Sequence, residues 1–277
     1  MKKSIKTSVW DAVLDTGVCD AYNNADLTIT LKMGFKQVNP SPGSATGTYN
    51  DYGDPSSPAR KIVRWTPAEW TRWKSHFLTS AQKYWSGKFW LINNFSALEY
   101  ENKGVKYRPN IWCRFNLVGG DASAGAYHHT IEVVRLHKTE TWFGSHSKLY
   151  DSLDTNLVQK GTDSKGKAIM QRAHVHEVGY LLGLGHVDIG KTHCPAAGNT
   201  NISACYGVQD ADKYSVMGQG MQLREKHANP WREAITKLTG KGNVTNVTDW
   251  LTKNNRHYSR TLIEAAAKKQ IIVRPKR

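Results

Sequence analysis

The sequence lacks the features that mark membrane proteins and proteins secreted by the classical route. No apolar run approaches the roughly 18 residues that a transmembrane helix needs. Residues 2–6 are mostly basic, as at the start of a signal peptide, but residues 7–15 contain two acidic residues and no apolar stretch. We therefore expect no classical signal peptide. The protein would be made in the cytoplasm, and a dedicated secretion or injection system would have to export it.

Cysteine is also scarce, with four residues in a chain of 277. The cysteines do not form the C-x-x-C pairs typical of structural zinc sites. Cys194 and Cys205 flank a loop that contains Gly, Asn and Ser. They are predicted either to form a disulfide, which would contribute roughly 2–3 kcal/mol, or to remain reduced as in a cytosolic protein. Cys19 is the only cysteine near the N-terminus, and its context does not indicate a pro-segment that blocks a zinc site.

Acidic residues are few beside basic ones: 23 Asp and Glu against 38 Lys and Arg give a formal net charge of +15. This excess favours an anionic partner. The basic residues are dispersed apart from those at 274–277, and no nucleic-acid-binding motif is present, so nucleic-acid binding is the least favoured function. With 39% hydrophobic and 10% aromatic residues, the chain can build a core as one large domain or two small ones.

The clearest helix signal follows residue 66. Thr66 suits the N-cap, Pro67 the first helical position and Glu69 the partner of a capping box. Large apolar side chains and one alanine then recur at helical spacing, at Trp70, Trp73, Phe77, Ala81 and Tyr84. The tryptophans could form a ligand-stacking surface, but the usual burial of large aromatic side chains favours the buried face of the helix.

Four segments of the sequence predict strands. Residues 27–38, 88–93, 110–118 and 129–136 each carry a strand pattern. The last of these is either an edge strand, on which an extended peptide could pair, or an ordinary strand inside a sheet.

The remaining segments are predicted from turn residues and helix boundaries. Residues 39–60 are rich in Pro, Gly, Ser, Asn and Asp and predict a long surface loop. Residues 139–165 predict an irregular segment with one or two short elements. Further helices are expected at about 165–183, at 229–240, and around 259–269.

The most informative stretch reads His-Val-His-Glu-Val-Gly-Tyr-Leu-Leu-Gly-Leu-Gly-His-Val-Asp. It matches the zinc-peptidase pattern H-E-x-x-H-x-x-G-x-x-H at four positions, namely His176, Glu177, Gly183 and His186, with Tyr180 where the second histidine belongs. Residues four apart share one helix face, where two imidazoles can reach one Zn²⁺. The neighbouring glutamate can take a proton from zinc-bound water. Gly183 lets the chain leave the helix, so that His186 arrives as a further ligand. A core helix that merely contains histidines does not explain these offsets.

A second motif lies downstream, where Tyr-Ser-Val-Met-Gly places a methionine at position 217. Together with the helix, this turn makes the chain resemble the metzincin clan of zinc endopeptidases. The resemblance covers residues 174–218. It implies His176 and His186 as zinc ligands, Glu177 as the general base and Met217 as the floor of the site.

The resemblance also implies an architecture. We expect an α+β (α/β-like) fold of metzincin type, with a twisted mixed sheet, two long helices and a smaller C-terminal lobe after the third ligand. Residues 1–240 would form a single catalytic domain that divides near residue 185, and residues 241–277 a basic appendage. Val187 and Gln219 depart from the residues that named families carry at these positions, so no family within the clan is assigned.

Tyr180 leaves three interpretations open. In the first, Tyr180 is an inactivating substitution, natural or introduced, because a phenol is longer than an imidazole and binds a metal well only when ionised. Alternatively, it binds zinc as a phenolate after local adjustment, and some activity survives. In the third interpretation another nearby group completes the site: His174, Asp188, His193 or Cys194. A regular helix would point His174 elsewhere, as a supporting or surface histidine. The need of catalytic zinc for three well-placed ligands favours the first interpretation.

The sequence therefore predicts a monomeric zinc-dependent endopeptidase that acts on a protein or peptide substrate. We expect an exported toxin or effector whose activity is reduced or lost because Tyr180 replaces a zinc ligand. The main alternative is a non-catalytic binding protein on a protease fold, which would gain neither zinc nor turnover from Tyr180→His. A basic nucleic-acid-binding protein would instead show steeply salt-dependent affinity.

Overall fold

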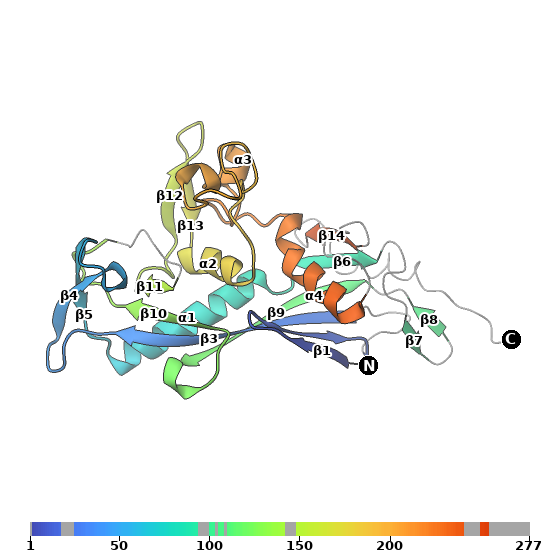
Figure 1. Ribbon diagram of the computed structural model, residues 1–277, viewed down its shortest axis with the longest axis horizontal. Coiled ribbons are helices and arrows are strands. Elements are labelled where there is room, and N and C mark those ends of the chain that lie inside the picture. The colour runs from blue at the N-terminus through green and yellow to red at the C-terminus, as the bar shows by residue number, and fades with distance from the viewer. Residues whose placement is uncertain are drawn as a thin grey trace. The chain divides into compact units, whose positions relative to one another are not determined.

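The computed structural model describes residues 2–17, 25–93, 100–102, 105–107, 110–141, 148–240 and 250–254. The chain forms two compact units. The terminal unit comprises Met1–Leu31, Gln82–Asn116 and Leu223–Arg277, and the site unit comprises Lys32–Ala81 and Leu117–Gln222. Figure 1 labels strands β3 (Ala25–Val38) and β9 (Ile111–Asp121) and helix α1 (Pro67–Trp85). Each of these three elements contributes residues to both units. Helices and a mixed sheet occur together, which confirms the α+β class.

Strand β10 (His129–Val134) of the site unit is hydrogen-bonded along both of its edges. It runs parallel to the second half of β3 and parallel to β11 (Leu149–Asp151). An extended peptide needs an unpaired edge to add a strand. The interpretation of this segment as an edge strand is therefore wrong, and the alternative of an ordinary sheet strand is confirmed.

Two antiparallel hairpins occur in the site unit, one inside the predicted surface loop and one that begins in the segment predicted to hold one or two short elements. Strands β4 (Thr46–Asn50) and β5 (Ala59–Val63) pair within the predicted surface loop, joined by a 3-10 turn at Asp51–Gly53. Strands β12 (Val158–Thr162) and β13 (Ala168–Gln171) form the second hairpin. Because β13 occupies residues predicted to be helical, the site helix α2 is shorter than expected and spans Ala173–Leu181.

Helix α1 begins as the sequence predicts. The Thr66 and Glu69 backbone N–H groups each donate to the other residue's side-chain oxygen, at 3.4 and 3.3 Å, which forms the capping box. The predicted apolar face is buried, except that the half-buried Tyr84 gives way to the fully buried Trp85. The indoles of Trp70 and Trp73 stack with ring centroids 5.8 Å apart. These tryptophans belong to the core, as predicted, and do not form an exposed stacking surface.

The terminal unit contains β1, β2, β6 and β14 of the large sheet, to which β10 and β11 of the site unit also belong. The order is β1 (Lys2–Lys6), β2 (Asp11–Asp15), β3, β9, β6 (Phe89–Asn93) and β14 (Trp250–Asn254). The pairs β1–β2, β2–β3, β6–β9 and β6–β14 are antiparallel. A small hairpin joins β7 (Tyr100–Asn102) to β8 (Val105–Tyr107). The strands β1 and β2 were not predicted from the sequence.

Helix α4 (Asn229–Thr239) confirms the helix predicted after the methionine turn. It follows a 3-10 turn at Glu225–Ala228, and Gly240 ends it in the left-handed conformation at φ 63°. Its buried Trp231 donates from the indole N–H to the Arg114 carbonyl at 2.8 Å. The helix predicted around residues 259–269, like Cys19, lies outside the described residues.

His227 in the terminal unit gives a testable pH dependence. The side chain is 1% exposed, and its Nδ1 accepts the Arg224 backbone N–H at 3.0 Å. Burial, together with the positive charges of Lys226 and Arg224, lowers its pKa from 6.5 to about 3. Below pH 6.5, His227 therefore binds a proton in the unfolded chain but not in the folded chain, and this favours unfolding. The free energy of unfolding is unaffected by this proton above pH 6.5 and falls by about 2 kcal/mol by pH 5.

The measurement is urea unfolding at pH 7 and pH 5 of the parent chain and of His227→Asn. Asparagine keeps a hydrogen-bond acceptor for Arg224 but does not titrate. The difference in unfolding free energy between the two proteins should change by about 2 kcal/mol between the two pH values. Equal pH dependence of both proteins would contradict the assignment to His227.

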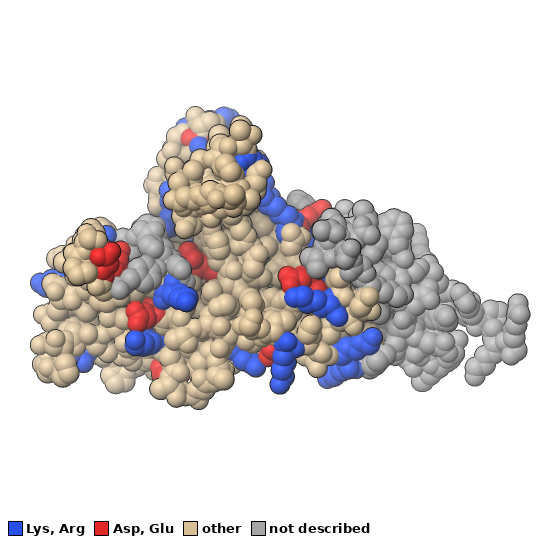
Figure 2. Space-filling view, in the orientation of Figure 1, with Lys and Arg blue, Asp and Glu red and all other residues tan. Residues whose placement is uncertain are grey.

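The surface of the described residues carries mixed charge. On the face drawn in Figure 2, Lys and Arg side chains lie singly or in small groups, several of them beside Asp or Glu. Among the described residues, Lys74 pairs with Asp121 and Lys191 pairs with Asp212. No helix within the described ranges has the length and apolar character of a membrane span.

Candidate functional site

Helix α2 and the turn after it bring three predicted site residues together. His176 and Tyr180 lie on one face of the helix, with ring centroids 5.3 Å apart. The chain then reverses at Gly183, whose φ of 94° is disfavoured for residues with a Cβ. The reversal places the His186 ring 5.5 Å from His176 and 4.7 Å from Tyr180, measured between centroids. The motif spacing thus produces one compact group of rings.

Backbone carbonyls fix the orientation of both imidazoles. Nδ1 of His176 lies 2.7 Å from the Val216 carbonyl oxygen, and Nδ1 of His186 lies 2.6 Å from that of Thr200. A carbonyl oxygen only accepts, so each Nδ1 carries a proton, and in a neutral ring Nε2 then carries the lone pair. Metal-binding histidines are commonly held in this way by a hydrogen bond from the second nitrogen.

The other ring nitrogen of His186, Nε2, has no hydrogen-bond partner among the described residues. The residue is 4% exposed. Burial lowers the pKa of His186 to about 4, although the hydrogen bond to Thr200 opposes this shift. The ring is therefore neutral near pH 7 and presents a buried, unpaired acceptor. Such a group in a native structure calls for a partner such as an ion.

The predicted methionine turn lies against this group. Met217 is 1% exposed, and its carbonyl accepts the backbone N–H of Val187, next to His186, at 3.0 Å. The neighbouring carbonyl of Val216 anchors His176. One turn therefore supports both histidines.

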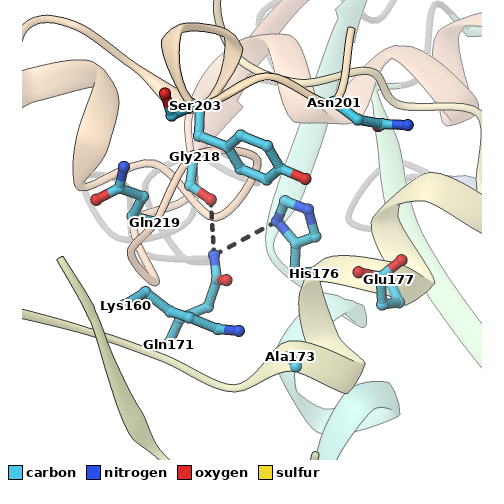
Figure 3. Close-up of a pocket in the computed structure, with 10 residues that line it drawn as sticks. Lys160, Gln171, Ala173, His176, Glu177, Asn201, Ser203, Gly218 and Gln219 are labelled. Atoms are coloured by element: carbon cyan, nitrogen blue, oxygen red, sulfur yellow. Dashed lines mark hydrogen bonds between the residues drawn. The ribbon is translucent and has the colours of Figure 1, made fainter. Parts of the chain in front are cut away.

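Gln171, which the sequence did not single out, holds the methionine turn in place. It is 4% exposed at the end of β13. Its amide nitrogen lies 2.9 Å from the Gly218 carbonyl oxygen and 3.4 Å from Nδ1 of His176 (Figure 3). It also lies 3.1 Å from the Gly220 carbonyl oxygen and 3.2 Å from that of Val216. The two amide hydrogens are shared among these carbonyls. The predicted helix covered this position, so no local pattern marked Gln171 as a buried donor.

An open cavity of about 310 Å³ adjoins His176. Glu177 and Lys160 line it together with Tyr206 and Gln219. Burial lowers the pKa of Lys160 to about 8, although the negative charges of Asp154, Glu177 and Asp151 oppose that shift. The cavity therefore combines a carboxylate next to the first histidine with a partly buried amine.

Two phenols accompany the imidazoles. The hydroxyl of Tyr180 is buried and has no hydrogen-bond partner within the described part of the chain. Burial, with added effects of Tyr206 and Glu177, raises its pKa far above the usual value. Tyr206 ends the 3-10 turn Ser203–Tyr206, and its ring centroid lies 3.7 Å from that of His186 and 5.8 Å from that of His176. Burial and then Glu177 raise the pKa of Tyr206 to about 12. The sequence did not indicate Tyr206.

His174 takes no part in this group, and the expectation that it could be a surface residue is wrong. The side chain is fully buried. Its Nδ1 donates to the Asp154 carbonyl at 3.0 Å, so Nε2 accepts the Ser80 hydroxyl at 2.7 Å. Both nitrogens are therefore used, and His174 supports the packing of α2 and does not complete a metal site.

The other three residues considered as replacement ligands, Asp188, His193 and Cys194, are held in ion pairs or in a disulfide. The buried Asp188 carboxylate pairs with Lys191 and with His193, the latter at 2.8 Å. Cys194 and Cys205 form a disulfide, which decides between the two states predicted for them. The interpretation in which one of these groups replaces the missing histidine therefore has no support in the geometry.

The residues fit zinc in part. Two imidazoles with anchored Nδ1 atoms meet its needs, but the third position holds a phenol with a buried hydroxyl. Within the described residues no cluster of three or more His, Cys, Asp or Glu side chains is arranged to hold a metal ion.

Comparison with protein-family models, curated proteins and solved structures finds no match to this chain. A functional assignment therefore depends on the site itself.

Proposed function

We propose that this chain is a metzincin-like zinc endopeptidase whose otherwise assembled site is disabled by Tyr180. The observation that carries the proposal is the anchoring of both histidines. Val216 and Thr200 accept from the two Nδ1 atoms and so orient both Nε2 atoms as metal ligands. The unpaired Nε2 of His186 and the methionine turn beside it support the same conclusion.

Each residue then has a definite role. His176 and His186 would hold the ion, and bound zinc supplies polarisation of the peptide carbonyl and of a water molecule. Glu177 lines the cavity next to His176, where its carboxylate takes the proton of the attacking water and passes it to the leaving amine. The open cavity receives the substrate, which we propose to be a polypeptide.

Tyr180 explains why the chain as it stands should hydrolyse peptides weakly or not at all. Catalytic zinc uses three protein ligands and keeps one position for water. Tyr180 lies on the same face as His176, in the place of the second ligand. Its phenol is neutral at pH 7 because burial raises its pKa. A neutral phenol is a poor replacement for imidazole.

The test is Tyr180→His, compared with the parent chain and with Tyr180→Phe. We expect Tyr180→His to bind one zinc ion per chain and to cleave an unfolded protein such as casein. Tyr180→Phe should do neither, which controls for the loss of the hydroxyl. Zinc content is measured by elemental analysis and cleavage by gel electrophoresis. Absence of both zinc and cleavage in Tyr180→His would refute the proposed site and favour a non-catalytic binding protein, and zinc without cleavage would refute the peptidase activity.

A further inference from the structure

We propose that the Cys194–Cys205 disulfide positions His186, so that the site is complete only when these two cysteines are oxidised. The inference names a regulation of the proposed function, and its zinc measurement rests on that function. Its other measurement, the protonation of the His186 ring, is independent of zinc.

The disulfide closes a loop, residues 194–205, that carries the anchor of His186. Thr200 in this disulfide loop accepts the hydrogen bond from Nδ1 of His186 at 2.6 Å. Asn201 and Ser203 of the same loop line the cavity (Figure 3). The disulfide loop therefore supplies both the support of one histidine and part of the cavity wall.

The residues between the two cysteines have few other attachments. Most of them are exposed to solvent. Within the described part of the chain, one hydrogen bond joins residues 195–204 to residues outside the loop, and it is the bond from His186 to Thr200. Gly190 and Asp188 donate to the carbonyls of the cysteines themselves, at 2.8 and 3.1 Å, and so hold only the ends of the loop. Without the covalent link the intervening chain gains conformational freedom, against which a single hydrogen bond is a weak restraint.

His176 is anchored by a different part of the site unit. Its Nδ1 lies 2.7 Å from the carbonyl oxygen of Val216. This carbonyl belongs to the methionine turn, which Gln171 holds in place. Neither Val216 nor Gln171 lies in the disulfide loop. Loss of the disulfide should therefore release His186 and leave His176 oriented.

Closing the disulfide loop is an oxidation. The two thiols form the S–S bond, and their two protons and two electrons pass to a disulfide oxidant, which leaves as two thiols. Thiols stay reduced in the cytosol, whereas disulfides form in oxidising compartments. The chain would thus have an incomplete site in the cytosol and gain a complete one on transfer to an oxidising compartment. Both cysteines are buried in the closed form, which protects the bond from renewed reduction.

The first measurement compares three samples of the full-length chain. They are the oxidised chain, the same chain refolded from urea in dithiothreitol, and a double variant that combines Cys194→Ala with Cys205→Ala. Nitrogen-15 NMR of the imidazole rings at pH 7 reports which ring nitrogen carries the proton. We expect His186 to carry it on Nδ1 in the oxidised chain and to lose this preference in the other two samples, while His176 keeps it in all three. Cys113→Ala is the matched control, because Cys113 is a buried free cysteine of the terminal unit and its loss should affect neither ring.

The second measurement is the zinc affinity of the Tyr180→His variant. Loss of a partner that orients a metal-binding histidine weakens metal binding by about 10- to 100-fold. We expect a decrease of this size when both cysteines of the disulfide are replaced by alanine in the Tyr180→His background. A competitive zinc titration measures it. Alanine variants serve here in place of the reduced chain, because free thiols bind zinc themselves.

The outcomes separate this inference from the proposed function. An unchanged His186 ring after loss of the disulfide would overturn the inference. Equal changes in both histidine rings, or equal zinc affinity with and without the disulfide, would overturn it as well. If the disulfide controls the His186 ring but the oxidised Tyr180→His variant binds no zinc, the peptidase proposal alone fails. If that variant binds zinc and cleaves protein while the His186 ring does not respond to the disulfide, this inference alone fails.

Discussion

Glu177→Gln, introduced into the Tyr180→His variant, is expected to lower peptide hydrolysis by at least about 100-fold. Glu177 lines the cavity beside His176, and glutamine has nearly the same shape but cannot take a proton. The loss should therefore fall on kcat, with zinc content and KM nearly unchanged. A quenched-fluorescence peptide assay and elemental analysis measure these quantities.

The matched control is Glu132→Gln in the same background. Glu132 is also in the site unit, but it pairs with Lys36 at 2.9 Å on the surface. Its substitution should leave hydrolysis within about twofold, since an exposed ion pair contributes little. Comparable rates for the Glu177 and Glu132 variants would show that Glu177 is not the general base.

Gln171→Leu is expected to reduce the free energy of unfolding by about 3 kcal/mol. The substitution removes the buried amide that serves the carbonyls of Val216, Gly218 and Gly220; Val216 keeps its bond to His176, but the other two acceptors lose this donor. It should also weaken zinc binding in the Tyr180→His background, because the Val216 carbonyl anchors His176. Urea unfolding followed by tryptophan fluorescence measures the first effect, and a competitive zinc titration measures the second.

Gln159→Leu provides the comparison for that prediction. Gln159 lies on the same hairpin, and its exposed amide donates to the Gly161 carbonyl at 3.4 Å. We expect a change below about 0.5 kcal/mol, as for most surface substitutions. Equal stability of the two variants would mean that Gln171 does not hold the methionine turn.

The helical spacing of the motif was sufficient to predict that His176, Tyr180 and His186 lie together. Residues four apart share a helix face, and a glycine with positive φ reverses the chain after the helix. The capping box of α1 and its buried tryptophans were likewise predicted from local pattern. These features depend on interactions between residues that are near one another in the sequence.

The hairpin β12–β13 shows where local pattern fails. Its residues are held by cross-strand pairing, which the spacing of side chains along one strand does not reveal. The start of α2 was therefore placed too early, and Gln171 was taken as helical. The sequence also did not decide whether β10 lies at the edge of a sheet or inside it. Its neighbour β11 follows a segment without clear periodicity, so this pairing could not be predicted.

The sequence by itself determined the motif: the two histidines, the glutamate beside the first, and a tyrosine where a ligand is expected. Only the tertiary structure decided what surrounds them. It anchors both Nδ1 atoms on backbone carbonyls, engages His174 with Asp154 and Ser80, and brings Tyr206 against His186. The physical reason is that helical periodicity encodes contacts within one turn of chain, whereas hydrogen bonds and ring contacts between distant segments arise only when the core packs.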